Sequence, residues 1–325
     1  MPEHTCLIGI DGGGSKTKFL CVNECGETLG EAQVGATVYH QDGIEHVIRE
    51  LRGGLEQVLP QGAHAVICYG MPGYGEIPEE DQAAAAAIAE ALAPFPIRFE
   101  NDVTIGWAGS LALSPGVNIV GGTGSIAYGR DASGTGARSG GWHEFFSDEG
   151  SGYWLGRELL TLFSQQSDLR RPRTALYEIV RTGLALRNDS DINCLAKERF
   201  APSRRETAAL QRLLLEAARQ GDPCALDCYR TASRYLAGIL CATIRKLRFP
   251  DGNPIPVSYS GGLFQIADLI LEPVRLEAAA EMAPVPLDFR SPRLSPCAGG
   301  ILMAAEAFSP KALPELREIL LRGGQ

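Results

Sequence analysis

The chain repeats one pattern: an apolar strand, a glycine-rich turn and a second strand occur over residues 6–22 and again over residues 116–129. The first turn reads DGGGSKT at residues 11–17 and the second reads GGTGS at residues 121–125. Glycine adopts the positive φ angles that point successive N–H groups into one concavity, so both turns suit an anion. An ordinary tight turn is an equal alternative for the first, since Asp-Gly commonly opens one. The repetition predicts a duplicated α/β unit.

Alternating strands and helices follow the first hairpin. We expect further strands at residues 27–34, 63–69 and 96–99, and helices at residues 42–59 (capped by Asp42), 78–92 and 103–113. Open α/β sheets bind ligands beyond the carboxyl ends of their strands, and Asn101-Asp102 directly follow such a strand. Asp102 is therefore expected where chemistry occurs. Its alternative or additional role is the N-cap of the following helix.

The second half returns to the same plan and then departs from it. After the second hairpin we expect a third strand near residues 137–141, and then helices only, before an inner strand at residues 256–259. The helices expected before this strand cover residues 153–165, 175–186, 191–200, 203–220 and 222–247. Two more are expected after it, at residues 295–308 and 310–321. The fold class is α/β, with one lobe over residues 1–115 and a second over residues 116–325. The second lobe carries a helical insertion at about residues 160–249, and the last helix is free to pack back on the first lobe.

Composition limits the kinds of partner. A chain of 325 residues with 45% hydrophobic residues is long enough for two domains, each with its own core. The formal net charge of −9 comes without any Lys/Arg run, which argues against nucleic acid as a partner. Phosphate would then be held by backbone amides and a metal ion. No apolar run is long enough to cross a membrane, so we expect a cytoplasmic protein with no membrane partner.

The nine cysteines are dispersed through apolar segments. An odd count in a chain of this size favours reduced, buried thiols over disulfides. The closest pairs, Cys21/Cys25 and Cys224/Cys228, lack the two-residue gap of zinc knuckles. Ligation of an iron–sulfur cluster is the remaining alternative.

Residues 99–156 combine the features of a phosphoryl-transfer site. They contain a carboxylate at a strand end, the second glycine turn, and DEGSG at residues 148–152 before a helix. Phosphoryl transfer needs N–H donors for phosphate oxygens, a carboxylate for the attacking hydroxyl, and Mg²⁺, for which Asp11 is the candidate ligand. Asp148 suits sugar hydroxyls and Trp142 suits a pyranose face, although acidic residues also favour a helix start for structural reasons. These residues predict a sugar kinase.

Two further loops are candidate ligand contacts. Thr37 lies in a loop after the third strand, where side chains can face a substrate. Gly261-Gly262 follow the inner strand and let the backbone approach a flat ligand such as adenine. Close packing between a helix and a strand is an equal alternative for the two glycines.

The ordered motifs resemble the BadF/BadG/BcrA/BcrD-type ATPase family, in the branch of N-acetylglucosamine kinases and bacterial glucosamine kinases. The motifs that carry the resemblance lie at residues 11–18, 101–102, 121–128, 141–142, 148–156, 261–262 and 298–305. The resemblance covers nearly the whole chain except the helical insertion. It implies two ribonuclease-H-like lobes of the actin/hexokinase type, the substrates ATP and an amino sugar, Mg²⁺, and a homodimer.

The resemblance also implies residue roles. The contacts to ATP would be Gly12, Gly13, Gly14, Ser15, Lys16, Thr17, Gly122, Thr123, Gly124, Ser125, Gly261 and Gly262. The contacts to sugar would be Thr37, Asn101, Asp102, Gly141, Trp142 and Asp148, with Asp102 also acting as the base for the 6-hydroxyl. The chain departs from the family at Thr37, where Asn is frequent, and at residues 141–144, which read GWHE in place of GWGH.

The expected reaction is the phosphorylation of N-acetylglucosamine at its 6-hydroxyl, with glucosamine as the alternative substrate. Two alternatives come from other classes. An iron–sulfur activator ATPase needs cysteines near the second turn, and the sequence has none between Cys68 and Cys194. A non-catalytic sugar sensor would not need Asp11, Asp102 and both glycine turns together.

Overall fold

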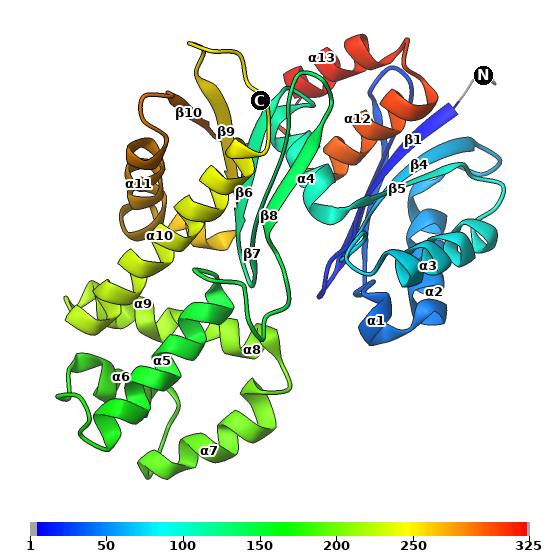
Figure 1. Ribbon diagram of the computed structural model, residues 1–325. Coiled ribbons are helices and arrows are strands. Elements are labelled where there is room, and N and C mark those ends of the chain that lie inside the picture. Colours follow the sequence, from blue (N-terminus) through cyan, green and yellow to red (C-terminus); the bar gives the residue numbers. More distant parts are fainter. Residues whose placement is uncertain (1–4, 324–325) are drawn as a thin grey trace. The chain divides into compact units, whose positions relative to one another are not determined.

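The structure is a computed structural model that describes residues 5–323. The described chain divides into two compact units (Figure 1). Unit 1 contains the chain up to Asn118, Ala132–Gly134 and the chain from Arg290 onward, and unit 2 contains Ile119–Asp131 and Thr135–Phe289. We expected a second lobe over residues 116–325 whose last helix was free to pack back on the first lobe. In the structure the chain from Arg290 onward groups with unit 1, where helix α12 (Pro296–Phe308) packs against strand β1 (Thr5–Asp11).

Unit 1 is built on a five-stranded sheet in the order β3-β2-β1-β4-β5. The strands besides β1 are β2 (Thr17–Val22), β3 (Thr28–Val34), β4 (His64–Met71) and β5 (Ile97–Asn101). β2 is antiparallel to its neighbours β1 and β3, whereas β1, β4 and β5 run parallel to one another. The hairpin and the strand–helix–strand units expected from the sequence are therefore present in one sheet.

One face of this sheet is covered by α2 (Ile44–Val58) and α3 (Pro78–Ala91). Alternate residues of β1, including Ile8 and Ile10, join the fully buried core with Leu51 of α2 and Ile88 of α3. The short helix α1 (Tyr39–Asp42) precedes α2. The prediction that Asp42 caps the long helix is wrong: Gly43 occupies the N-cap, and the Asp42 carboxylate accepts from the Val38 amide at 3.2 Å.

The other face of the sheet is covered by α12 and by α4 (Asp102–Leu111), and α13 (Leu313–Gly323) packs on α12. This contact depends on small residues. A Cβ at Gly9 would collide with the Cys297 carbonyl, and a Cβ at Gly299 would collide with the Ile105 carbonyl. At Gly9 and at Gly299 backbone therefore meets backbone, which leaves no room for a side chain at either position.

Unit 2 repeats the strand order of unit 1. Its sheet reads β10-β9-β6-β7-β8, which matches β3-β2-β1-β4-β5 when read in reverse with β6 in the place of β1. The strands are β6 (Gly116–Gly121), β7 (Ser125–Arg130), β8 (Gly136–Gly140), β9 (Ile255–Ser260) and β10 (Leu287–Arg290). The predicted duplication is confirmed. We did not predict β10, because its four residues, LDFR, alternate between apolar and polar over too short a run to mark a strand, and they are only half-buried or exposed.

The rest of unit 2 is helical. Its helices are α5 (Gly152–Ser167), α6 (Ala175–Gly183), α7 (Ile192–Leu195), α8 (Arg204–Ala209), α9 (Gln211–Arg219), α10 (Pro223–Arg245) and α11 (Glu272–Met282), with short 3₁₀ or π segments at Asp189–Asp191, Ala196–Phe200, Gly262–Gln265 and Ala267–Leu271. The single helix predicted at residues 203–220 is in fact two helices that meet at Leu210.

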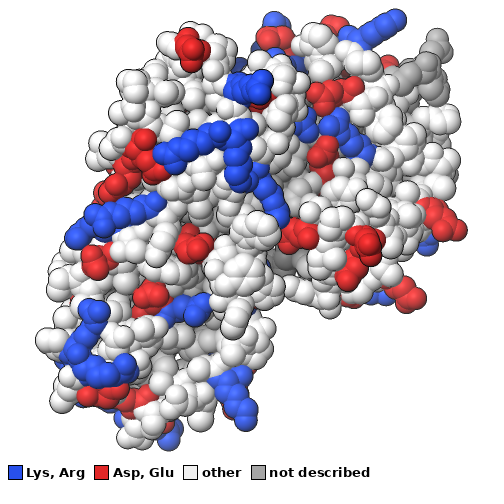
Figure 2. Space-filling view, viewed as in Figure 1, with Lys and Arg blue, Asp and Glu red and all other residues white. Residues whose placement is uncertain are grey.

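The surface in view (Figure 2) carries charges of both signs, and most of the cysteines are buried. Figure 2 shows acidic and basic side chains intermixed on the face in view. The nine cysteines are free thiols, and six of them are buried. Among residues 5–323, no helix combines the length and the apolar character that a membrane crossing requires.

Candidate active site

The parallel strands of unit 1 end at one edge of the sheet, and two carboxylates lie there. Asp11 is the last residue of β1 and pairs with Gly70 of β4, while Met71 of β4 pairs with Asn101 of β5. Asp102 follows immediately as the first residue of α4. The pairing brings Asp11 and Asp102 to the same edge, as expected for ligand-binding residues of an α/β sheet.

Asn101, and not Asp102, is the N-cap of α4. Its side-chain oxygen accepts from the Val103 amide at 3.1 Å, and its Nδ2 donates to the Tyr74 carbonyl at 2.8 Å. The Asn101 side chain therefore joins the start of α4 to the loop after β4. The capping role considered for Asp102 belongs to its neighbour, which leaves the Asp102 carboxylate less committed to the fold.

The Asp102 carboxylate is half-buried and weakly held. One oxygen, Oδ1, accepts from the Val103 amide at 3.0 Å, and no side chain among residues 5–323 is hydrogen bonded to the group. Desolvation, and to a lesser extent the negative charge of Asp11, raise the pKa of Asp102 to about 7. A carboxylate with such a pKa can take up and release a proton near neutral pH.

Asp11 has the properties of a cation ligand. Desolvation raises the pKa of its carboxyl group to about 6, and the charges of Lys18 and Lys16 oppose this shift without cancelling it. A half-buried carboxylate at a strand end, beside a second carboxylate, would be stabilised by a divalent cation. These residues fit Mg²⁺, although they form no complete cage by themselves: residues 5–323 contain no cluster of three or more His, Cys, Asp or Glu residues suited to a metal.

The first glycine turn is anchored at its base and open at its tip. The Gly12 amide donates to the Gly70 carbonyl at 3.0 Å, and the Gly13 carbonyl accepts from the Thr37 amide at 3.3 Å. Within the described chain, the exposed amides of Gly14 and Ser15 donate to no protein acceptor. The tip therefore has donors available for an anion.

Thr37 is part of the anchor. Its side chain is fully buried, its Oγ1 lies 2.8 Å from the Thr17 Oγ1, and its carbonyl accepts from the Tyr69 hydroxyl at 3.3 Å. We expected this side chain to face a sugar. In the structure its hydroxyl instead joins the loop after β3 to the first glycine turn.

The second glycine turn is fastened to the start of α5. The amides of Gly152 and Tyr153 donate to the carbonyls of Gly122 and Thr123 at 2.8 and 3.1 Å. Across the turn, the Gly122 amide donates to the Gly124 carbonyl at 2.9 Å. In the described residues the Thr123 and Gly124 amides have no acceptor, so two successive N–H groups remain available at this turn.

Asp148 is buried beneath the second turn. Its side chain is only 3% exposed, and its Oδ1 accepts from the Ser125 amide at 3.1 Å. Its other oxygen is bound by the guanidinium of Arg204 on α8. We expected Asp148 to bind sugar hydroxyls, but in the structure both of its oxygens are engaged within unit 2. The sequence contains no signal for Arg204, which lies 56 residues away in the helical insertion.

Trp142 is a surface residue. Its ring is 64% exposed, and the Arg138 guanidinium lies 5.5 Å from the ring centroid. It borders an open hollow of about 360 Å³ together with Tyr235 and Ile239 of α10. The preceding Gly141 has a φ of +63°, which aims the chain out of β8. The ring is available as an apolar platform.

The two glycines after β9 differ from each other. Gly261 has a φ of +98°, and a Cβ there would collide with the Gly121 carbonyl at the end of β6. This supports close packing as the role of Gly261. A Cβ at Gly262 would meet nothing within 4 Å, so its backbone is open to a ligand.

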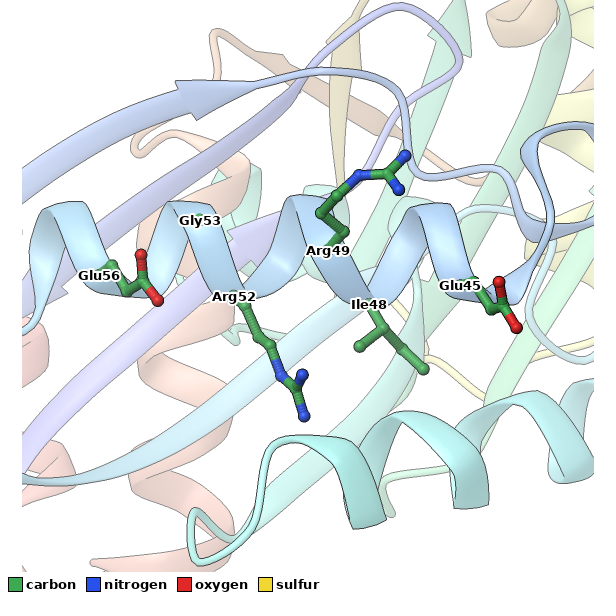
Figure 3. A pocket seen from close by; sticks show the side chains of 6 residues that line it. All are labelled: Glu45, Ile48, Arg49, Arg52, Gly53 and Glu56. Atoms are coloured by element: carbon green, nitrogen blue, oxygen red, sulfur yellow. The ribbon is translucent and has the colours of Figure 1, made fainter.

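A larger hollow lies elsewhere in unit 1. It has a volume of about 520 Å³ and is lined from α2 by Glu45, Ile48, Arg49, Arg52, Gly53 and Glu56 (Figure 3). Arg52 donates to the Ala91 carbonyl at 2.7 Å, at the end of α3. None of the predicted site residues lines this hollow, so it is separate from the candidate active site.

Solved structures share the fold. A crystal structure from Chromobacterium violaceum, assigned provisionally as an N-acetylglucosamine kinase, matches with a TM-score of 0.75 and 24% identity, over 92% of this chain and 98% of that one. A ROK family glucokinase from Streptomyces griseus, solved with glucose and AMPPNP, matches with a TM-score of 0.53 and 17% identity, over 93% and 98% of the two chains. The predicted actin/hexokinase-like fold is confirmed.

Two named relatives are similar to this chain over most of their length. An N-acetyl-D-glucosamine kinase of Dictyostelium discoideum is 29% identical over 79% of this chain and 84% of the relative. An N-acetylmuramic acid/N-acetylglucosamine kinase of Clostridium acetobutylicum is 30% identical over 83% and 89%. The sequence profile of one ATPase family matches residues 8–281, which run from strand β1 to helix α11. The chain belongs to the BadF/BadG/BcrA/BcrD ATPase family.

Proposed function

We propose that this protein transfers the γ-phosphoryl group of ATP to the 6-hydroxyl of an amino sugar, converting N-acetylglucosamine to N-acetylglucosamine 6-phosphate. Membership of an ATPase family supports the use of ATP. Two relatives that carry N-acetylglucosamine kinase in their names support the substrate class. The observation that carries the proposal is the position of the Asp102 carboxylate directly after β5, at the carboxyl ends of the parallel strands of unit 1, where burial raises its pKa to about 7.

Asp102 would act as the general base. Its Oδ1 stays on the Val103 amide, and its Oδ2 accepts the hydrogen of the sugar 6-hydroxyl. As the sugar oxygen forms a bond to the γ-phosphorus, the bond from that phosphorus to the bridging oxygen breaks, and ADP leaves with the electron pair. The proton of the hydroxyl passes to Asp102. Positioning and charge stabilisation supply most of the rate enhancement in such transfers.

The two glycine turns would hold the phosphates of ATP. The first offers Gly12, Gly13, Gly14, Ser15, Lys16 and Thr17, and the second offers Gly122, Thr123, Gly124 and Ser125. The open amides at Gly14, Ser15, Thr123 and Gly124 support these roles. Asp11 would hold Mg²⁺, which supplies neutralisation of the charge on the phosphate oxygens. Gly262 would border the adenosine, with Gly261 providing the close packing that places it.

The sugar would be bound by loops at the strand ends. Trp142 offers its exposed ring to the pyranose face, and the backbone at Gly141 positions that ring. Asp102 orients the reacting hydroxyl. Thr37 and Asn101 would act through the loops that they anchor, and Asp148 through the second glycine turn, since their polar atoms already have partners in the structure.

The test is ADP release by the pure protein with Mg²⁺ and ATP. The sugars to compare are N-acetylglucosamine, glucosamine, N-acetylmannosamine, N-acetylmuramic acid and glucose, with a reaction lacking sugar as the baseline and Asp102→Asn as the matched control. Strong stimulation by N-acetylglucosamine supports the proposal. Stimulation by glucosamine alone would change the substrate to the free amine. Hydrolysis independent of sugar, or sugar binding without turnover, would overturn the kinase proposal.

Assembly and location follow from the same proposal. A homodimer is proposed by resemblance to the kinase branch, and multi-angle light scattering of the pure protein tests it directly. The cytoplasm is the proposed compartment because ATP and reduced thiols are both maintained there. Localisation of the tagged full-length chain by fractionation tests the second point.

A further inference from the structure

We propose that Arg204, a residue of the helical insertion, is a positioning residue that holds Asp148 under the second glycine turn and thereby shapes the turn for nucleotide phosphate. This inference rests on the proposed function for its kinetic consequence. Its structural part, the rigidity of the turn, can be tested without any turnover.

Arg204 makes a set of contacts inside unit 2. One guanidinium nitrogen, Nη2, is bound to Asp148 Oδ2, and the other, Nη1, lies 3.6 Å from Glu144 Oε2. The guanidinium carbon lies 6.0 Å from the ring centroid of Tyr153, in the first turn of α5. One side chain therefore connects the loop before α5, the helix α5 itself and α8.

The contact reaches the glycine turn through Asp148. Asp148 Oδ1 accepts from the Ser125 amide at 3.1 Å, so the carboxylate lies between the turn and the guanidinium. A Cβ at Gly124 would lie 2.8 Å from Asp148 Oδ1 and 3.2 Å from Arg204 Nη2. The glycine, the carboxylate and the guanidinium are thus in direct contact, and a shift of one displaces the others.

The electrostatics of the pair make Arg204 necessary to this arrangement. Burial raises the pKa of Asp148, and the nearby Glu144 charge acts in the same direction, while Arg204 and the Ser125 amide lower it. Without the guanidinium, a buried carboxylate would face Glu144 with no cation beside it. It would then take up a proton or move toward water, and the Ser125 amide would lose its charged acceptor.

The backbone that carries Arg204 is itself fixed. A Cβ at Gly156 of α5 would collide with the Thr207 carbonyl of α8, so the two helices are in backbone contact. The Thr207 hydroxyl donates to the Phe200 carbonyl at 2.8 Å, and the Ser203 side chain caps α8 by accepting from the Glu206 amide at 3.2 Å. Arg204 therefore projects from a rigid helix start. The helical insertion in this way contributes to the geometry of a turn that lies about 80 residues earlier in the chain.

The guanidinium fork matters as well as the charge. Its two terminal nitrogens reach two different carboxylates, Asp148 and Glu144, from one planar group. A lysine offers a single point charge on a flexible stem, so Arg204→Lys should keep the neutralisation of Asp148 but lose the bridge to Glu144. This predicts partial rescue by lysine and no rescue by methionine.

The first experiment measures amide hydrogen exchange of the ligand-free protein, with peptides covering residues 121–128. Arg204→Met should accelerate exchange in these peptides by on the order of 10-fold, because the Ser125 amide loses its anchored acceptor. Arg170→Met is the matched control: Arg170 also pairs with an aspartate, Asp168, but both side chains are more than half exposed. Equal exchange in the two variants would overturn the structural part of the proposal.

The second experiment measures nucleotide affinity and kinetics. Binding of a fluorescent ATP analogue should weaken in Arg204→Met by on the order of 10- to 100-fold, and KM for ATP should rise by a similar factor with a smaller change in kcat. Arg204→Lys should fall between the wild type and Arg204→Met. The double variant Arg204→Met/Asp148→Asn removes the uncompensated charge, so its thermal stability should recover while its nucleotide affinity should not.

The outcomes separate the two proposals. If the wild type shows no sugar-dependent turnover, the proposed function fails, while exchange and nucleotide binding still test Arg204. If turnover is present and KM for ATP in Arg204→Met equals that in Arg170→Met, the positioning role fails and the kinase proposal stands. If thermal stability and nucleotide affinity both recover in Arg204→Met/Asp148→Asn, the role of Arg204 is only to neutralise the Asp148 charge. That result would overturn the proposal.

Discussion

Asp11 ends β1 and Asp102 directly follows β5, two parallel strands of one sheet with only β4 between them, and the negative charge of Asp11 helps to raise the pKa of Asp102. Desolvation is the larger cause of the shift. The pair thus combines a candidate cation ligand with a candidate base, and the protonation of one depends on the other. This relationship leads to the first two predictions.

The rate of sugar phosphorylation should fall on the acid side with a midpoint near the Asp102 pKa of about 7. Only the ionised carboxylate accepts a proton, so kcat/KM decreases as pH falls through that value. Replacing Asp11 with Asn removes a neighbouring negative charge and should lower the Asp102 pKa. Carboxyl-carbon NMR titration of aspartate-labelled protein checks this directly, and an unchanged Asp102 titration in Asp11→Asn would contradict the coupling.

Asp102→Asn should separate activity from stability. We expect kcat to fall by about 10²- to 10⁴-fold, because the base is lost while the side-chain shape is kept. Near-normal turnover would remove Asp102 from the role of base. Rates measured at saturating sugar and ATP are the appropriate comparison.

The same variant should be more stable than the wild type at pH 8 by about 1 kcal/mol, a figure discounted for the partial exposure of the half-buried Asp102 to solvent. The folded-state pKa of Asp102, about 7, lies above its ordinary value of 3.8, so the folded protein binds more protons than the unfolded chain between these values. The free energy of unfolding contributed by Asp102 therefore decreases as pH rises through this window. The advantage of Asp102→Asn should vanish near pH 4. Urea unfolding at both values checks the sign, with the exposed Asp168→Asn as the control.

Gly299→Ala should destabilise unit 1 strongly. An added Cβ would collide with the Ile105 carbonyl in the contact between α12 and α4, and the expected loss is about 3 kcal/mol. Gly106→Ala on α4 is the matched control, because a Cβ there would meet nothing within 4 Å. The control should be neutral or stabilising by up to about 1 kcal/mol, since alanine favours helix. Similar urea midpoints for the two variants would contradict the close contact.

Gly124→Ala and Gly122→Ala should differ although they lie in the same turn. A Cβ at Gly124 would press on Asp148 and Arg204, whereas a Cβ at Gly122 would meet nothing within 4 Å. We expect a loss of about 1–3 kcal/mol for Gly124→Ala and a thermal midpoint within error of the wild type for Gly122→Ala. Calorimetry of both variants checks the difference, and equal midpoints would show that the turn can move away from Asp148.

Much of the fold is readable from local sequence signals. Short continuous apolar runs mark β1 and β4, helical spacing marks α2, and the two glycine turns mark the duplicated hairpins, because each signal depends on residues close together in the chain. The position of Asp102 after a parallel strand is equally local. The missed features are those whose signals are too weak: β10 has only four residues, and the break at Leu210 falls inside a continuous helical pattern.

Other properties depend on contacts between distant residues. The sequence by itself determined the repeated strand–turn–strand plan, the open glycine turns and the placement of Asp102 at a strand end. Only the tertiary structure decided that Arg204 holds Asp148, that Thr37 is buried against Thr17, and that Asp102 titrates near neutrality. The physical reason is that desolvation and ion pairing depend on what surrounds a side chain in space, and these neighbours come from parts of the chain that local periodicity does not connect.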